Sequence, residues 1–572
     1  LDQMDFKQKA EEKKMSMSKN IARLAVTAGL TAALSFGGVM APVTMAFAEG
    51  EANGSVTITN ANGNETNFKG YKIFDANVVK DENGQTLVSN ITWANNKVET
   101  AVTEEIEKID SNASITTAQD AADWIKTHVR GTYETTSVES GSAAYKIAAA
   151  VAAVTGLDDS SDYATTSKGA ANNLSHGYWL FVTDAATVEG VEAATAPIFT
   201  VVGDEAININ EKTSIPTVDK EVKEGDNWRK VSDSYIGEEV EYKLTGHVAS
   251  NIATFNKYEY VFQDTLSKGL EVVKDSNDAA KDLHVYIDNK GKQTEVVQDA
   301  NNGYKVALGQ DKATKKENLT ITFSDLKAVK DKTGAPIKVD ANSSVVVTYK
   351  AKLNSDVEYG ATGTTNEVKL VYSNNPMSNG TGTSVSTKVT DHVFRLDVTK
   401  VDKDDQTHKL EATFQVKMTH EGNKKLTQEK WLTQEGGLTE EGTNAGKFKT
   451  DKDSGEIYIP GLVAGTYEIT ECNTPAGYNT LAPFTITVAP TYNDDGSLKS
   501  LGVTSSDTEM VTPRTTNDAT IPVTIQNKKG SGLPLTGLNG VTFTWIAGGA
   551  VLCIGVAHLI RSRKQAEESE QE

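Results

Sequence analysis

Apolar and polar residues alternate with a period of two over most of this chain, and this pattern limits its fold more than any other feature. Short alternating runs, separated by turns rich in Gly, Asn and Asp, fill the segments from about 213 to 391 and from about 392 to 528. Successive side chains of a strand point to opposite faces, so such runs predict strands with one buried face. We therefore expect each segment to form a β-sandwich.

The segment from 49 to 212 combines strand and helix patterns. Thr116 or Thr117 could cap a helix, and Ser142 could open an alanine-rich helix that ends at Gly156. The chain is thus predicted to be mainly β, with tandem immunoglobulin-like sandwiches and helical insertions in the first domain. The strand-like runs of this segment are 55–59, 70–75 and 178–182.

Three polar residues of the 392–528 segment fall on the apolar side of their strands. They are a lysine, Lys400, a glutamate, Glu471, and an asparagine, Asn527. Since residues two apart share a face, all three should point into the same core. The apolar residues on their faces are Phe394, Leu396 and Val398 for the lysine, Tyr467 and Ile469 for the glutamate, and Ile521, Val523 and Ile525 for the asparagine.

The 213–391 segment repeats this combination with an aspartate in place of the glutamate. Lys220, Asp264 and Asn366 each lie an even number of positions from the apolar residues of their predicted strands, so they share the apolar face. Burying one such group alone costs several kcal/mol, so we expect the members of each set to meet. The apolar residues on their faces are Pro216, Val218 and Val222 for the lysine, Tyr258, Tyr260, Phe262 and Leu266 for the aspartate, and Val368, Leu370 and Tyr372 for the asparagine.

A buried lysine, acid and asparagine in contact can react. Burial favours the neutral amine and the neutral acid, and the neutral amine is a nucleophile. The acid can hydrogen-bond the asparagine carbonyl and shuttle protons while ammonia leaves. The expected product is an isopeptide bond between the first and last strands of each domain, Lys400 to Asn527 and Lys220 to Asn366. By analogy with disulfides, closing such a loop contributes about 5 kcal/mol.

Disulfide bracing is not expected. The two cysteines of the chain are Cys472, in a strand-rich segment, and Cys553, in an apolar segment near the C-terminus, so they are unsuited to pair with one another.

The N-terminal 48 residues have the pattern of a secretory signal peptide. Basic residues precede an apolar run from 24 to 45, and the small-x-small tripeptide Ala46-Phe47-Ala48 follows it. We expect cleavage after Ala48 and export of the chain. A retained membrane anchor is the alternative reading of this segment.

The C-terminal 44 residues, from 529 to 572, carry three signals in order: a pentapeptide within the 529–540 spacer, an apolar stretch at 541–560 and a charged tail at 561–572. The stretch is long enough to span a bilayer, and the basic start of the tail favours the cytoplasmic side. This order resembles the sorting signal cut by sortases, which implies cleavage after Thr536 and transfer to an amine. A single-pass membrane protein is the alternative. The pentapeptide is Leu533, Pro534, Leu535, Thr536 and Gly537.

Further motifs resemble the major pilins that sortases assemble on Gram-positive bacteria. The run 467–471 followed by Pro-Ala-Gly-Tyr at 475–478 is similar to the E-box of pilins and of collagen-adhesin B-type domains. The runs 262–270 and 366–368 resemble the middle domain of these pilins, and 70–74 and 177–180 their N-terminal domain. The resemblance implies that Glu471 and Asp264 act as the autocatalytic acids of collagen-adhesin-type sandwiches.

In that family, a lysine between the first two domains attacks the threonyl thioester of the next subunit. Lys212, in the run Asn210-Glu211-Lys212, is the candidate for this role, and Lys223 is its main competitor. The family motif is Tyr-Pro-Lys, and this chain lacks its first two residues at this place.

These patterns favour a structural protein, the backbone subunit of a covalent pilus anchored to the cell wall. Its expected partners are a sortase, neighbouring subunits and peptidoglycan, and a host surface ligand is a further candidate. The alternative is a monomeric wall-anchored adhesin. The net charge of −21 argues against nucleic acid, and the sequence shows no HExxH motif or phosphate-binding loop, so we expect no enzyme, metal or cofactor.

Overall fold

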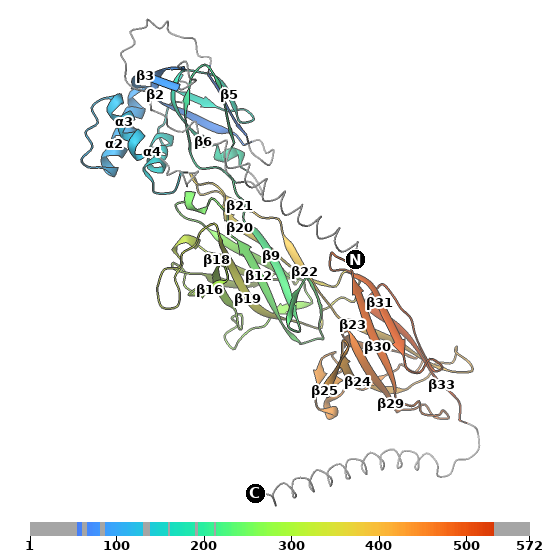
Figure 1. The fold of residues 1–572 in the computed structure, drawn as a ribbon. Helices are drawn as coiled ribbons and strands as arrows, with labels where there is room; N and C mark the ends of the chain where they lie inside the picture. The colour runs from blue at the N-terminus through green and yellow to red at the C-terminus, as the bar shows by residue number, and fades with distance from the viewer. Residues whose placement is uncertain are drawn as a thin grey trace, which may run out of the picture.

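A computed structural model describes residues 54–59, 66–80, 86–129, 138–157, 161–188, 193–210 and 213–530. These residues form tandem, mainly β domains that follow one another along an elongated molecule, with three helices in the N-terminal part (Figure 1). Among the described residues, no helix is both long and apolar enough to cross a membrane. The predicted signal peptide, pentapeptide, apolar stretch and tail all lie outside these residues, as does Lys212.

The first domain packs three helices against a five-stranded sheet, with a three-stranded sheet beside it. The five-stranded sheet has the order β3-β2-β6-β7 with β4 on β2, and the smaller sheet has the order β5-β1-β8. The strands are β1 (Gly54–Thr59), β2 (Phe68–Lys80), β3 (Thr86–Trp93), β4 (Tyr163–Thr165), β5 (Ala170–Leu174), β6 (Gly177–Thr183), β7 (Ile198–Val202) and β8 (Ala206–Asn210), and η1 (Ala185–Thr187) is a short 3₁₀ turn.

Side-chain caps define where the three helices begin. Thr117 caps α3 (Ala118–His128) and Ser142 caps α4 (Ala143–Ala152), as the sequence predicted, although α4 ends four residues before Gly156. The sequence reading missed α2 (Asn96–Ile109), which Asn95 caps by accepting hydrogen bonds from two backbone amides. Its buried residues, Val98, Val102 and Ile106, recur every four positions, so the helical period was present in the sequence.

The middle domain is a sandwich of two seven-stranded sheets around one core. One sheet has the order β10-β9-β12-β19-β15-β16 with β14 on β19, and the other β11-β22-β20-β13-β18-β17 with β21 on β20. Its strands are β9 (Thr217–Glu224), β10 (Asn227–Arg229), β11 (Val231–Asp233), β12 (Glu239–His247), β13 (Tyr260–Leu266), β14 (Leu270–Val272), β15 (His284–Asn289), β16 (Lys292–Glu295), β17 (Lys305–Gln310), β18 (Glu317–Phe323), β19 (Ser343–Leu353), β20 (Thr364–Ser373), β21 (Thr381–Thr383) and β22 (Thr387–His392), with 3₁₀ turns η2 (Ile252–Thr254) and η3 (Leu326–Ala328).

The C-terminal domain is a sandwich of a four-stranded and a seven-stranded sheet. The smaller sheet has the order β28-β23-β33-β32, in which the first and last strands of the domain pair in parallel. The larger has the order β26-β25-β24-β29-β30-β31 with β27 on β24. The strands are β23 (Phe394–Asp402), β24 (Thr413–Glu421), β25 (Lys424–Leu432), β26 (Leu438–Thr439), β27 (Phe448–Lys449), β28 (Glu456–Leu462), β29 (Gly465–Asn473), β30 (Phe484–Tyr492), β31 (Leu498–Ser505), β32 (Val511–Pro513) and β33 (Thr520–Asn527), with the 3₁₀ turn η4 (Gly442–Asn444).

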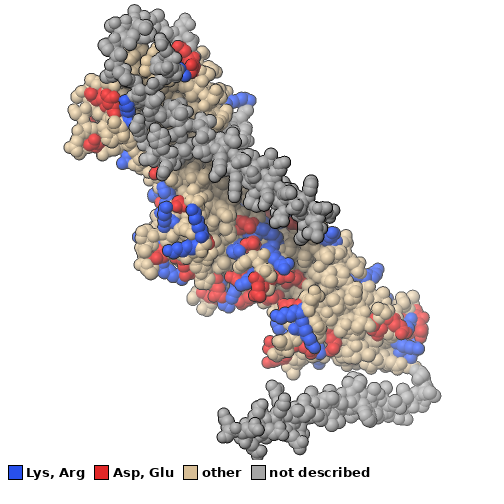
Figure 2. Space-filling view, viewed as in Figure 1, with Lys and Arg blue, Asp and Glu red and all other residues tan. Residues whose placement is uncertain are grey.

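Hydrogen bonds join the described parts of neighbouring domains. Between the first and middle domains, Tyr145 donates its hydroxyl to the carbonyl of Pro376 at 2.7 Å. Between the middle and C-terminal domains, the amide of Ile236 donates to the carbonyl of Gly436 at 3.2 Å, and that of Leu498 to the carbonyl of Ala361 at 2.8 Å. Basic and acidic residues are interspersed on the visible face of these last two domains (Figure 2).

Three carboxyl groups gather at the junction between the middle and C-terminal domains, of which Asp391 is buried and Asp233 and Glu238 are half-buried. Asp391 on β22 accepts hydrogen bonds from the hydroxyl of Ser234 at 2.9 and 3.0 Å and is 2% exposed. Asp233 accepts from the backbone amide of Ala464 in the C-terminal domain. Burial raises the pKa of Asp391 and of Asp233 to about 7, and that of Glu238 to about 8. These acids are therefore neutral in mildly acidic solution.

Because of these raised pKa values, we expect the free energy of unfolding to fall as the pH rises from 5 to 8. Asp391 holds its proton in the folded chain up to about pH 7 but releases it near pH 4 when unfolded, so its contribution falls across this interval. For a single group the loss is on the order of 2 kcal/mol. Calorimetric melting at pH 5 and pH 8 measures it. Asp391→Asn should show a flatter pH dependence than the native chain, and an unchanged slope would contradict the assignment.

Candidate cross-linking sites

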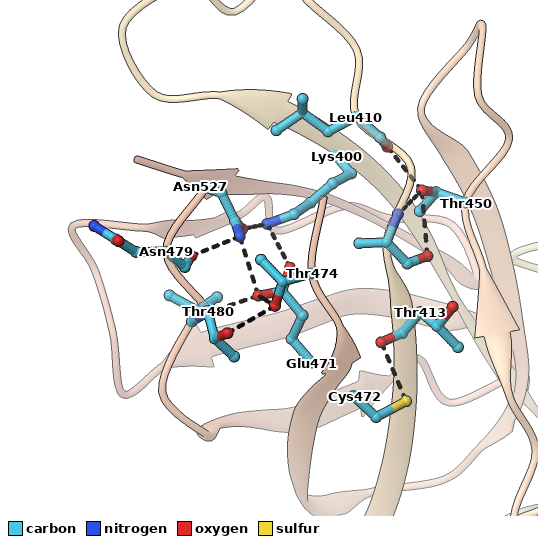
Figure 3. A network of polar contacts seen from close by, with 12 residues as sticks. Lys400, Leu410, Thr413, Thr450, Glu471, Cys472, Thr474, Asn479, Thr480 and Asn527 are labelled. Atoms are coloured by element: carbon cyan, nitrogen blue, oxygen red, sulfur yellow. Dashed lines mark hydrogen bonds and ion pairs between the residues drawn. The ribbon is translucent and has the colours of Figure 1, made fainter. Parts of the chain in front are cut away.

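Lys400, Glu471 and Asn527 meet in the core of the C-terminal domain, where each is at most 2% exposed. The Nζ of Lys400 contacts the Oδ1 of Asn527 and lies 3.4 Å from the Oε1 of Glu471. The Nδ2 of Asn527 donates to the Oε2 of Glu471 at 3.0 Å. Figure 3 shows the three side chains pointing toward one another. The carboxyl group thus reaches both the amine and the amide nitrogen.

Strand pairing explains why these residues meet. β23 and β33 are parallel neighbours, with Asp402 opposite Asn527, so the lysine and the asparagine reach the core from adjacent strands. Glu471 lies on β29 in the opposite sheet. The buried faces of all three strands follow the alternation expected from the sequence.

The loop that follows β29 completes the site. The Oε2 of Glu471 also accepts from the amide of Leu481 at 2.8 Å and from the hydroxyl of Thr474 at 3.2 Å. The carbonyl of Asn479 accepts the second hydrogen bond of the Asn527 amide at 2.9 Å. This loop therefore fixes the orientation of both the acid and the amide.

Lys220, Asp264 and Asn366 meet in the same way inside the middle domain, each at most 1% exposed. The Nζ of Lys220 contacts the Oδ1 of Asp264 and donates to the Oδ1 of Asn366 at 2.6 Å. The arrangement of strands differs from that in the C-terminal domain. Here the acid and the asparagine come from paired strands, β13 and β20, and the lysine comes from β9 in the opposite sheet.

A fourth side chain, Tyr349 on β19, enters the middle-domain site. Its hydroxyl donates to the Oδ2 of Asp264 at 2.6 Å and accepts from the Nδ2 of Asn366 at 2.8 Å. The sequence reading missed it, although Val345, Val347 and Tyr349 alternate on the buried face of their strand. A buried tyrosine hydroxyl usually has a partner, and this was the available signal.

Burial changes the titration of both lysines. It lowers the pKa of Lys400 to about 8, against the opposing charge of Glu471. It lowers the pKa of Lys220 to about 8 as well, against the opposing charge of Asp264. Burial therefore raises the uncharged fraction of each amine near neutral pH, and an uncharged amine is the reactive form.

Each arrangement can carry out one condensation. Transfer of a proton from the buried ammonium to the carboxylate gives a neutral amine and a neutral acid, which apolar surroundings favour. The amine can then attack the Cγ atom of the asparagine. In the C-terminal domain, where Glu471 contacts the amide nitrogen, the acid can also pass a proton to the departing group. The products would be an isopeptide bond and one molecule of ammonia.

One expectation about the middle domain was wrong. Lys220 does lie on its first strand, β9, but Asn366 lies on β20, and β21 and β22 follow it in the chain. A bond between these residues would join the two sheets and leave the last two strands outside the closed loop. The sequence reading placed Asn366 on the last strand because it did not predict those two strands. In the C-terminal domain, the lysine and the asparagine do lie on the first and last strands.

Of the two candidate acceptor lysines, the structure describes only Lys223. Lys212 follows β8 by two residues and lies outside the described residues. Its competitor Lys223 pairs with Glu241 at 2.9 Å and lies over the ring of Trp228, with its side chain 40% exposed.

The first domain contains a different buried lysine cluster. Lys72 is 3% exposed and pairs with Asp75 at 2.6 Å and Asp162 at 2.9 Å. It also donates to the hydroxyl of Ser175 at 2.8 Å. These partners are two carboxylates and a hydroxyl, whereas the other two domains provide one acid and one asparagine. We therefore describe this cluster as an ion-pair network.

Comparison with known proteins gives matches to pilins. A family model described as SpaA, prealbumin-like fold domain, matches residues 394–500, a span that holds Lys400 and Glu471. No curated protein matches the chain.

Solved structures of backbone pilins are similar at low identity. The T6 backbone pilin of Streptococcus pyogenes is 16% identical, with 83% of this chain and 98% of that one covered and a TM-score of 0.45. The major pilin SpaA of Corynebacterium diphtheriae is 13% identical, with 83% and 100% covered and a TM-score of 0.43. The pilus 2b backbone protein of group B streptococcus is 22% identical, with 55% and 99% covered and a TM-score of 0.39.

Proposed function

We propose that this chain is the structural backbone subunit of a covalently polymerised pilus on a Gram-positive cell wall. The observation that carries the proposal is the burial of two lysine–acid–asparagine sets in successive sandwich domains. Each set costs several kcal/mol to bury unless it reacts or is fully paired. A single-turnover Lys–Asn condensation accounts for both sets, and it is the only chemistry that we propose for the chain.

Isopeptide bonds suit a protein that carries tension. Lys400 and Asn527 lie on adjacent strands that begin and end their domain, so a bond between them would carry force past the domain core. The domains follow one another along an elongated molecule (Figure 1), as a shaft subunit requires. We also propose the domain limits 49–212, 213–391 and 392–528 that the sequence predicts.

Assembly is proposed to proceed head to tail. A sortase would cleave after Thr536 and transfer the threonyl carbonyl to Lys212 of the next subunit, and the last subunit would be transferred to peptidoglycan. The sequence signals that support this step are the pentapeptide, the apolar stretch and the basic residues after it. The exported, wall-anchored location follows from the same signals and from the signal peptide.

Replacing the acceptor lysine should abolish polymerisation. In cell-wall extracts of the native strain, we expect a ladder of very large species on denaturing gels. Lys212→Ala should collapse this ladder to a single subunit-sized band, because no amine remains at the acceptor position. The matched control is Lys223→Ala, which should leave the ladder intact.

Two other results would point elsewhere. A single band from the native strain would favour the monomeric adhesin, which needs no acceptor lysine. A ladder that survives Lys212→Ala but collapses with Lys223→Ala would move the acceptor to the competing lysine.

A further inference from the structure

The two proposed cross-linking sites use carboxyl groups of different length. In the C-terminal domain, Glu471 reaches the lysine with Oε1 and the asparagine Nδ2 with Oε2, at 3.4 and 3.0 Å. In the middle domain, the side chain of Asp264 is one methylene shorter. Its Oδ1 contacts Lys220, but its Oδ2 accepts from Tyr349 at 2.6 Å. The shorter acid thus meets the hydroxyl where the longer one meets the amide.

The hydroxyl of Tyr349 fills the position between the acid and the leaving group. It lies 2.8 Å from the Nδ2 of Asn366 and 3.2 Å from the Nζ of Lys220, so it contacts both nitrogens that exchange places in the reaction. The residue is fully buried, and its ring stacks on Tyr242 at 5.6 Å between centroids. Its position is therefore fixed by packing.

We propose that Tyr349 is a catalytic residue of the middle-domain cross-link, where it relays a proton from Asp264 to the departing nitrogen of Asn366. This inference rests on the proposed function, because it assumes that the condensation occurs. Asp264 and Tyr349 together span the distance that Glu471 spans alone.

The proton balance of the step is complete. The step starts from the neutral amine of Lys220 and the protonated Asp264, and attack of Nζ on the Cγ of Asn366 leaves one surplus proton on Nζ. Tyr349 gives its phenolic proton to Nδ2 and regains one from Asp264, and the resulting carboxylate takes the surplus proton from Nζ, while the Cγ–Nδ2 bond breaks and ammonia leaves. Burial, followed by the charge of Asp264, raises the pKa of Tyr349 well above its usual value, so the phenol is protonated at the start.

Tyr349→Phe tests the relay, because it removes only the hydroxyl and keeps the ring that packs in the core. We expect the C-terminal cross-link to form normally, with a loss of about 17 Da. The middle-domain cross-link should form 10²- to 10⁴-fold more slowly, about the range for general acid–base catalysis. Intact mass at set times after pulse synthesis of the full exported chain, with mass spectrometry of the linked peptides, measures both bonds separately.

Two further variants separate catalysis from packing. Tyr242→Phe removes a neighbouring buried hydroxyl that makes no contact with the lysine, the aspartate or the asparagine in the described structure, and it should cross-link at the native rate. Asp264→Glu combined with Tyr349→Phe should restore cross-linking, because the longer acid reaches Nδ2 directly, as Glu471 does.

The outcomes distinguish this inference from the function on which it rests. Native-rate cross-linking of Tyr349→Phe would overturn the relay, and so would a double variant that stays uncross-linked. A native chain that loses no ammonia from either domain would instead refute the proposed function itself.

Discussion

Glu471→Ala is expected to leave the C-terminal domain without its cross-link and to lower its free energy of unfolding by at least 5 kcal/mol. The bond would close a loop between residues separated by 127 positions, and a loop of this length contributes about 5 kcal/mol by analogy with disulfides. The variant also leaves Lys400 and Asn527 buried without their acid, which adds to the loss. Chemical denaturation of native and variant chains measures the difference.

Glu468→Ala is the matched control for this prediction. Glu468 lies on the same strand but on its outer face, where it is 37% exposed and pairs with Lys417 at 2.9 Å. Surface ion pairs of this kind contribute about 1 kcal/mol or less. If Glu471→Ala were no more destabilising than Glu468→Ala, the cross-link would make no contribution to stability.

When force is applied along the chain, the two sandwich domains should differ in the length of chain that each releases. With Lys400 bonded to Asn527, the C-terminal domain has a covalent path between its first and last strands, so we expect no unfolding step from it. In Asn527→Ala, the 127 intervening positions become free to extend, which releases roughly 400 Å. Single-molecule pulling on the chain without its predicted signal peptide detects a step of this size.

The middle domain should behave differently because its proposed bond excludes the last two strands. Between Asn366 and the end of β22 at His392, 26 residues lie outside the closed loop. Their extension releases roughly 90 Å, even when the bond is intact. A native chain that shows a step of several hundred Å from either sandwich would contradict the covalent path.

The period of two in the sequence was sufficient to predict the sandwiches and the six polar residues in their cores. The prediction succeeded because strand geometry is local: residues at i and i+2 share a face in whichever sheet the strand joins. Lys400, Glu471 and Asn527 could be assigned to one buried face without knowledge of their neighbours. The site geometry agrees with this assignment in both domains.

Pairing between distant strands could not be predicted in the same way. The arrangement of strands places Asn366 on β20 in one sheet and Lys220 on β9 in the other, and two more strands follow β20 in the chain. It also brings Tyr349 to Asp264 across 85 positions. Contacts of this kind depend on the whole sheet arrangement, whereas alternation reports only which face of a single strand is buried.

The intact mass of the chain, purified without the predicted signal peptide and the apolar stretch at 541–560, tests the central claim most directly. Each condensation releases one ammonia, so we predict a mass about 34 Da below that of the unmodified sequence. Digestion should yield two branched peptides, one joining Lys220 to Asn366 and the other joining Lys400 to Asn527. A chain with its full unmodified mass and only linear peptides would contradict the account.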